Sequence, residues 1–340
     1  MSLIKLNNRS SEDSAIHGKR NLIINGAMQV AQRGTSSTGI TGGGYYTVDR
    51  FRTAYNSSPD ELQFTQEQST DAPTGFANSL KLTVTTAETT LAVAERVRLQ
   101  QRIEGQNLQH LKYGTSNAEY LTLSFYVKSN VTGTYGIHFN NEDSSRSVCA
   151  SYTISASGTW EKKTISIAGD TTGSFGNDVN RSLDVCWVLA AGTDYTSGTL
   201  ATSWETQTNA NTAPSGQVDI TDTVSNYWQI TGVQLEVGDK ATPFEHRLYG
   251  EELSLCQRYY WQNEDVFVYG KSREADRHRD CTISLPVQMR ATPTVTKLTD
   301  PTGFTASWVS GGKQSIRMSG TAPNDGYVAT CGTAKAEAEL

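Results

Sequence analysis

The chain has 340 residues, of which 36% are hydrophobic and 19% charged, and its formal net charge is −6. A chain rich in Thr, Ser, Asn, Gln and Gly favours many short strands joined by turns and argues against helical bundles and coiled coils. The acidic charge argues against a nucleic-acid-binding protein, which usually carries a basic stripe. No apolar run reaches the ~18–20 residues that a membrane-spanning helix needs. The first residues lack the apolar stretch of a secretory signal. We therefore expect no nucleic-acid partner and no membrane insertion.

The five cysteines are widely spaced, odd in number and without a CxxC pair. Zinc sites usually bring close pairs of ligands, and disulfide frameworks usually have an even number of cysteines. The five histidines are equally dispersed. The sequence therefore predicts buried free thiols, no metal site and no cofactor.

Alternating apolar and polar residues recur from Tyr45 onward. The clearest run is 120–128, where a period of two places Leu121, Leu123, Phe125 and Val127 in a core and the intervening side chains on the opposite sheet face. Similar runs lie at 135–139, 165–167, 183–189 and 233–237, with turn clusters between them. This pattern predicts an all-β fold, an antiparallel jelly-roll sandwich.

Residues 250–261 give the best helix signal in the chain, with Glu251 and Glu252 in the first turn and Arg258 in the last. Six further short strands are expected after it. An initial strand is expected at 21–26, a surface excursion at 196–216 and a frayed tail at 334–340. We therefore expect four parts: an N-terminal segment with a Gly-rich loop (1–45), the jelly-roll sandwich (46–246), a short connecting helix (247–262) and a smaller C-terminal β domain (263–340).

Three apolar residues around this helix, Leu248, Leu255 and Tyr259, follow a heptad-like spacing on one face. One and a half heptads is too short for a coiled coil but sufficient for packing around a short symmetry axis. Symmetric self-association is a common way to cover such residues. We predict that these three residues form an oligomer interface.

Signatures of catalysis are missing from the sequence: there is no GxSxG, no phosphate-binding loop and no HExxH. We therefore expect no catalytic residues and a non-enzymatic protein. Glycosidases stay open as an alternative, because their paired carboxylates need no local motif. The run 140–143 has oxygen ligands for calcium, but we expect a polar hairpin turn there instead.

Sugar binding without cleavage fits the composition better than glycosidase activity does. Aromatic rings and polar groups on one sheet face can stack on pyranose rings and bind hydroxyl groups, and the outward set of 120–128 supplies both. The candidate glycan-binding residues are Tyr120, Ser124, Tyr126 and Lys128, with His138 expected on an adjacent strand of the same face. The alternative is that Tyr and Thr occur there because they suit a half-exposed pleated surface. For the nearby Trp160, we expect a core position at the start of a strand.

Two stretches carry a more specific resemblance. Residues 21–34 (NLIINGAMQVAQRG) and 46–51 (YTVDRF) resemble the opening of a family of tailed-bacteriophage virion proteins, described as tail-fibre, receptor-binding or head-fibre proteins. Residues 230–238 (ITGVQLEVG), 241–247 (ATPFEHR) and 249–253 (YGEEL) look like the end of the same family's sandwich and its helix. The strands around 158–161 (GTWE) look like a carbohydrate-binding-module jelly roll.

The resemblance implies a virion component that is assembled in the host cytoplasm, forms a homotrimer, and has one end anchored and the other exposed. We expect residues 1–45 to hold another virion protein and the sandwich to attach to host cell-surface glycan, as in a tail fibre or its distal part. Two alternatives remain: a capsid head fibre or decoration protein without a receptor role, and a tailspike-like glycan depolymerase.

Overall fold

The computed structural model describes residues 20–56, 62–262, 266–272, 278–299, 305–321 and 326–340. The chain forms two compact units. The sandwich unit contains residues 20–29 and Thr35–Arg247, and the C-terminal unit contains Val30–Gly34 and Leu248–Leu340. No helix in the described ranges is long and apolar enough to cross a membrane.

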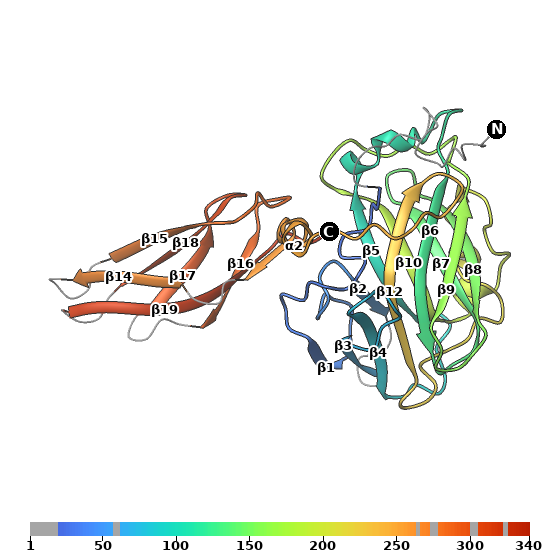
Figure 1. Ribbon diagram of the computed structural model, residues 1–340, viewed down its shortest axis with the longest axis horizontal. Helices are drawn as coiled ribbons and strands as arrows, with labels where there is room; N and C mark the ends of the chain where they lie inside the picture. The colour runs from blue at the N-terminus through green and yellow to red at the C-terminus, as the bar shows by residue number, and fades with distance from the viewer. Residues whose placement is uncertain (1–19, 57–61, 263–265, 273–277, 300–304, 322–325) are drawn as a thin grey trace, which may run out of the picture. The chain divides into compact units, whose positions relative to one another are not determined.

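The sandwich unit consists of two six-stranded sheets, drawn in Figure 1. The first sheet has the order β1 (Ser36–Ile40), β3 (Gln63–Ser69), β4 (Ser79–Thr86), β12 (Tyr227–Val237), β6 (Leu121–Ser129) and β9 (Glu161–Ile167). The second has the order β11 (Glu205–Thr206), β8 (Arg146–Ile154), β7 (Gly133–Asn141), β10 (Arg181–Ala191), β5 (Arg96–Glu104) and β2 (Arg52–Asn56). Every strand pairing between described residues is antiparallel, which confirms the all-β sandwich.

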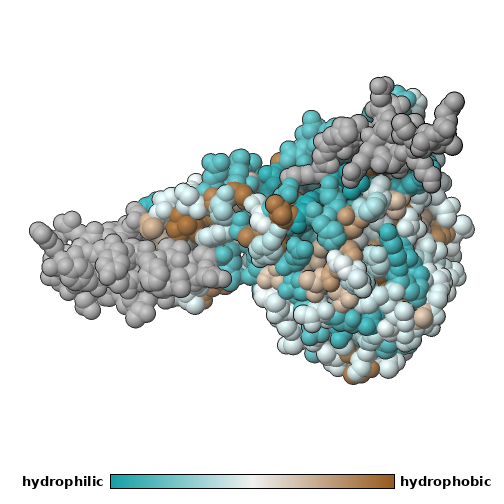
Figure 2. Space-filling model, in the orientation of Figure 1, coloured by the Kyte–Doolittle hydropathy of each residue, from teal (hydrophilic) through white to brown (hydrophobic). Residues whose placement is uncertain are grey.

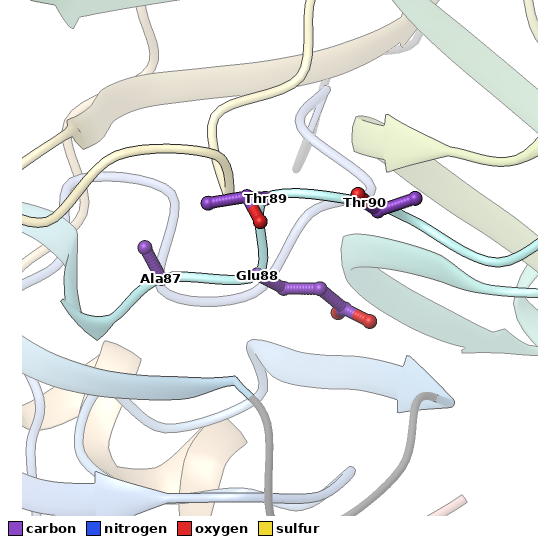
Figure 3. A pocket seen from close by; sticks show the side chains of 4 residues that line it. All are labelled: Ala87, Glu88, Thr89 and Thr90. Atoms are coloured by element: carbon purple, nitrogen blue, oxygen red, sulfur yellow. The ribbon is translucent and has the colours of Figure 1, made fainter.

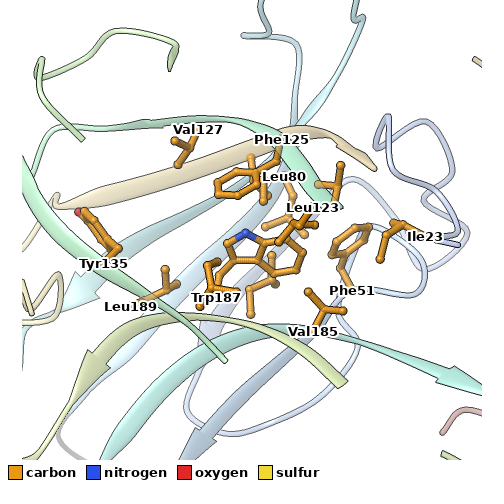
Figure 4. Packing of buried hydrophobic residues seen from close by; sticks show 14 of the residues in the cluster. Ile23, Phe51, Leu80, Leu123, Phe125, Val127, Tyr135, Val185, Trp187 and Leu189 are labelled. Carbon is orange, nitrogen blue, oxygen red and sulfur yellow. The ribbon is translucent and has the colours of Figure 1, made fainter. Parts of the chain in front are cut away.

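The core lies between the two sheets and centres on Trp187 of β10 (Figure 4). The ring of Phe125 meets Trp187 edge-on at 5.8 Å between centroids, and Phe51 lies 6.4 Å away. Phe125 is one of the four residues of 120–128 that the alternation assigned to the core, and all four are fully buried. The period of two thus identified the inner face of β6.

The N-terminal stretch is part of the sandwich. Ile23 and Met28 are fully buried, and the Asn21 side chain donates to the Val233 carbonyl oxygen at 2.9 Å. Residues 21–26 form bends and turns, so the strand expected there is wrong. Of the N-terminal segment expected at 1–45, residues 1–19 lie outside the described ranges, and 20–29 and 35–45 pack with the sandwich.

The polar excursion after β10 covers part of the second sheet's outward face. It contains α1 (Thr193–Thr196), β11 and η4 (Asn209–Asn211). The Cys149 amide of β8 donates to the Ala201 carbonyl at 2.6 Å, and the Gly136 amide of β7 donates to the Gln217 side chain at 3.1 Å. These hydrogen bonds hold the excursion against β7 and β8. Two shorter turns, η2 (Gly105–Asn107) and η3 (Gln109–Leu111), follow β5.

The C-terminal unit begins with α2 (Tyr249–Gln257), shorter than the helix expected at 250–261. The helix stops early because Tyr260–Gln262 form β13, which pairs with β19 (Gly326–Glu337). β14 (Val266–Ser272) and β16 (Thr294–Thr299) also pair with β19, while β15 (His278–Ser284), β18 (Ser315–Thr321) and β17 (Thr305–Ser310) form a three-stranded sheet. The frayed tail expected at 334–340 is wrong, because Ala334, Ala336 and Ala338 are buried in this unit's core.

Candidate functional site

Four of the five candidate glycan-binding residues lie on the outward side of β6, and His138 does not. Tyr120, which directly precedes β6, is 48% exposed, and Tyr126 and Lys128 are half-buried. His138 belongs to β7 in the second sheet and is 1% exposed. Its expected place on the same face is wrong, because alternation assigns a residue to a face of its own strand but not to a sheet.

Ser124 is on the expected face but is only 3% exposed. The segment after β12 fastens to this part of the face: the Glu245 amide donates to the Gln234 side chain at 2.7 Å, and the Thr242 hydroxyl donates to Glu236 at 2.6 Å. Gln234 lies directly opposite Ser124 across the ladder. Ser124 is therefore closed to a large ligand.

The remaining half of the first sheet's outward face carries three half-buried aromatic rings, each with a lysine ammonium group nearby. Nζ of Lys162 lies 5.9 Å from the centroid of the Tyr126 ring. The same distance separates Lys128 from Trp160, and Lys81 lies 5.4 Å from Tyr227. These are favourable cation–π separations. We call this surface the ring–lysine face: Tyr126, Trp160, Tyr227, Lys81, Lys128 and Lys162.

Strand register explains why these groups meet. Tyr126 lies opposite Lys162 on β9 and opposite Thr231 on β12, and Lys128 lies opposite Gln229. Gln229 in turn lies opposite Lys81 of β4. Directly opposed residues share a face of a sheet, so four neighbouring strands contribute to one surface.

Asp71 anchors one edge of the ring–lysine face. Its carboxylate accepts from Nζ of Lys128 at 2.7 Å and from Nε1 of Trp160 at 3.2 Å. Burial alone would raise the pKa of Asp71, but the hydrogen bonds from Lys128 and Trp160 outweigh it and lower the pKa below its usual value. The carboxylate stays ionised and fixes the orientation of one ring and one ammonium group.

An aromatic cluster supports Tyr126 from the other side. Phe76 lies 5.5 Å from Tyr126, 5.0 Å from Phe244 and 5.4 Å from His246, between ring centroids. Gly232, at the bulge in β12, leaves the space that these rings occupy. Its φ of +60° is also a conformation that favours glycine.

Replacing Gly232 with alanine is expected to destabilise the sandwich and displace the rings. The new Cβ would lie 2.6 Å from the Phe76 ring and 3.0 Å from Tyr126. Left-handed strain alone costs ~1–2 kcal/mol. The matched control is Gly39→Ala, where φ is +64° and no atom lies within 4 Å of the added Cβ. Urea unfolding should show a larger loss for Gly232→Ala, and equal losses would mean that the rings do not depend on this glycine.

A small hollow lies elsewhere on the sandwich, lined by Ala87, Glu88, Thr89 and Thr90 (Figure 3). Its volume is ≈ 300 Å³, and its lining contains one carboxylate. In the described ranges, no group of three or more His, Cys, Asp or Glu side chains is arranged to hold a metal ion. The possible calcium run at 140–143 covers the end of β7 and the first half of a hairpin turn at 142–145, which leads into β8.

The three residues proposed for an oligomer interface do not share one surface. Leu248 is 81% exposed and precedes α2, Leu255 is half-buried, and Tyr259 is 1% exposed. The three residues would lie on one face only if the helix continued through Tyr259, but α2 ends at Gln257. The prediction of a single interface face is therefore wrong for Tyr259.

The sequence did not indicate three members of the ring–lysine face, and the prediction for Trp160 was wrong. Tyr227 could have been found, because it alternates with the core residues Trp228 and Ile230 along β12. Lys81 and Lys162 also lie on alternating strands, but only the strand order brings them beside the rings. Trp160 is half-buried, and its indole contacts Lys128 and Asp71 at the surface rather than packing in the core.

The part of the sandwich seen in Figure 2 is mainly hydrophilic, with small scattered apolar patches. Among known proteins, no family model and no curated protein matches the chain. Solved structures match at low similarity. A family 11 carbohydrate-binding module from Clostridium thermocellum, in complex with a β-1,3-1,4-mixed-linked tetrasaccharide, is 9% identical, with 61% of this chain and 98% of that chain covered and a TM-score of 0.31.

Two further structures are similar to the same degree. A putative sugar-binding protein from Bacteroides thetaiotaomicron is 14% identical, with 64% and 100% of the two chains covered and a TM-score of 0.33. A tandem CBM22 domain from Paenibacillus barcinonensis Xyn10C is 9% identical, with 96% and 93% covered and a TM-score of 0.30. At these scores, function is argued from the chain's own geometry.

Proposed function

We propose that the chain is a non-enzymatic virion protein of a tailed phage, a tail fibre or its distal part, which attaches to host surface glycan through the ring–lysine face. The observation that carries the glycan proposal is the grouping of three half-exposed rings with three lysines on one open sheet surface. The virion setting rests on the resemblance of residues 21–51 and 230–253 to phage fibre proteins.

The geometry suits a sugar because pyranose rings have both apolar faces and hydroxyl edges. Rigid aromatic rings provide flat apolar contact, and a few polar groups around them fix the orientation of a ligand. Beside the rings, the Asp71 carboxylate accepts from Nζ of Lys128, so the positions of both charged groups are fixed. An open sheet face also suits a long polysaccharide better than a closed pocket.

We expect a single ring–lysine face to bind glycan weakly. Several copies of the protein on one virion would bind the same surface more tightly. Linking several sites raises the effective concentration of the second binding event, so that avidity exceeds single-site affinity by ~10²–10⁴. A homotrimeric fibre with its N-terminal segment held by another virion protein would provide that repetition. This is the expected role of residues 1–45.

Trp160→Ala and Tyr126→Ala are each expected to weaken glycan binding about tenfold, as loss of a central aromatic contact does. The measurement is a glycan array with a multimerised full-length protein, followed by titration of the glycans that bind. Tyr249→Ala is the control: Tyr249 is 57% exposed at the start of α2, in the C-terminal unit. Its replacement should leave affinity unchanged.

The two alternative functions make different predictions in the same assay. A depolymerase would release new reducing ends from the bound polysaccharide, whereas we expect none. A head fibre without a receptor role would show no binding on any array, and labelled particles would carry the protein on the capsid. Absence of binding by the multimerised wild-type protein would contradict the proposal.

A further inference from the structure

The outward face of the second sheet gathers arginines on neighbouring strands. Arg96, Arg98 and Arg102 alternate along β5 with buried core residues, so all three point away from the core. Arg52 of β2 lies opposite Gln100, between Arg98 and Arg102. Four guanidinium groups therefore share one side of two adjacent strands, on the opposite sheet from the ring–lysine face.

The charges of Arg52, Arg96 and Arg98 are not neutralised by carboxylates of the described residues. Asp184, opposite Arg102 on β10, accepts from Nε of Arg181 at 2.7 Å. In the described part of the chain, Arg52, Arg96 and Arg98 form no ion pair with a carboxylate. Like charges held this close repel one another and destabilise the ligand-free fold.

The pKa values of two arginines reflect this crowding. Burial and then the charge of Arg98 lower the pKa of Arg96 to about 10. Burial, with the charges of Arg102, Arg98 and Arg181, also lowers the pKa of Arg52. A bound anion would relieve both the desolvation and the repulsion.

Buried polar groups line the same face, and several of their atoms lack a hydrogen-bond partner among the described residues. A row of directly opposed residues, Gln100, Cys186 and His138, runs across β5, β10 and β7. His138 is 1% exposed, and neither of its ring nitrogens has a hydrogen-bond partner among the described residues. The Nε atoms of Arg96 and Arg98 are likewise buried and unpaired there. Buried polar groups are nearly always satisfied, so these atoms point to a missing ligand.

The guanidinium groups are held in place. The Tyr195 ring of α1 lies 4.2 Å from Cζ of Arg96. Gly43 packs closely against the Arg52 side chain: a Cβ atom added to this glycine would lie 2.9 Å from Nη2 of Arg52. Fixed planar guanidinium groups bind carboxylate, sulfate and phosphate oxygens in pairs.

We propose that Arg52 and Arg98, with Arg96 and His138 behind them, bind an acidic group carried by a glycan: a carboxylate, sulfate or phosphate on a polysaccharide. An acidic glycan fits better than a nucleic acid, because the chain's net charge of −6 repels a densely charged polyanion. A single local cationic patch matches an isolated acidic group on an otherwise neutral sugar chain. This site is separate from the ring–lysine face.

The test is titration of the full chain at low ionic strength with three probes: a polygalacturonate oligosaccharide, a sulfated oligosaccharide and inorganic phosphate, with a neutral dextran as the blank. At least one acidic oligosaccharide should bind, raise Tm and lose affinity as salt increases. Phosphate binding alone would assign the site to a free anion and overturn the glycan assignment, as would equal binding of a single-stranded oligonucleotide.

The variant Arg52→Gln/Arg98→Gln should bind the acidic oligosaccharide at least about tenfold more weakly, as expected for lost charged hydrogen bonds. Its Tm without ligand should be equal to or above that of the wild type, because repulsion is removed. Lys240→Gln/Lys313→Gln removes the same charge from two exposed residues and should leave affinity unchanged. Trp160→Ala should also leave it unchanged, which separates this site from the ring–lysine face.

The proposal is overturned if no acidic probe binds, or if the lysine control loses as much affinity as the arginine variant. A fall in Tm without ligand for Arg52→Gln/Arg98→Gln would assign these arginines a structural role instead.

Discussion

Replacing Trp187 with alanine is expected to lower the free energy of unfolding by about 3–5 kcal/mol, as removal of a large buried side chain does. Trp187 is fully buried at the centre of the sandwich core, and the rings of Phe51 and Phe125 pack around it (Figure 4). The two sheets close over it, so the lost volume cannot be filled from solvent. Urea unfolding followed by far-ultraviolet circular dichroism measures the effect.

Trp160→Ala is the matched control, because it removes the same side chain from the surface of the same unit. Its indole is half-buried and makes one hydrogen bond, to Asp71. We expect a loss of about 1 kcal/mol or less. If Trp187→Ala does not fold, Trp187→Phe keeps a ring in place and should show a smaller, measurable loss. Equal losses at Trp187 and Trp160 would contradict the assignment of the core.

His138 is expected to make the stability of the sandwich depend strongly on pH. Burial, followed by the charges of Arg98, Arg96 and Arg181, lowers the pKa of His138 to about 3. A histidine in the unfolded chain titrates near 6.5, so the folded state disfavours the proton that the unfolded state accepts. This contribution to stability is fully present above pH ~6.5 and decreases as the pH falls towards about 3, by ~1.4 kcal/mol for each pH unit.

The measurement compares the wild type with His138→Leu at pH 7.5 and 5.5, in buffers free of phosphate and sulfate. Other titrating groups are common to both proteins, so the difference between the two pH dependences isolates His138. The wild type should lose about 1.4 kcal/mol more than the variant on going to pH 5.5. Identical pH dependences would show that the imidazole is hydrated or paired in solution.

The inner faces of the strands could be predicted from the sequence because burial imposes a period of two. Residues 121–127 illustrate this: each apolar member of the alternating run is fully buried. The outward partners on the same strand, Tyr126 and Lys128, were assigned to a common face for the same reason. Alternation within one strand is thus sufficient to predict which of its side chains point into the core and which point outward.

Relations between strands could not be predicted, because they depend on the order of the sheets. The sequence places Lys81, Lys128 and Trp160 far apart, and only the order β4-β12-β6-β9 brings them to one surface. His138 shows the converse: its strand follows β6 directly in the chain but pairs into the other sheet. The four arginines of β2 and β5 went unnoticed because the chain as a whole is acidic.

The helix predicted at 250–261 is too long, because strand pairing replaces its last residues. The apolar spacing of Leu248, Leu255 and Tyr259 continues a helical pattern, and nothing local stops the helix before Trp261. Tyr260–Gln262 instead pair with the end of β19, a distant segment of the chain. The burial of Ala336 and Ala338 in the tail has the same cause, since this strand forms part of the C-terminal unit's core.

The most direct test of the glycan-binding account is a crystal structure of the full chain with the oligosaccharide that binds it most tightly. The account predicts sugar rings stacked on Tyr126, Trp160 or Tyr227, with hydroxyl groups within hydrogen-bond distance of Lys128 or Asp71. A neutral oligosaccharide bound anywhere else on the chain, with these three rings left open to solvent, would contradict it.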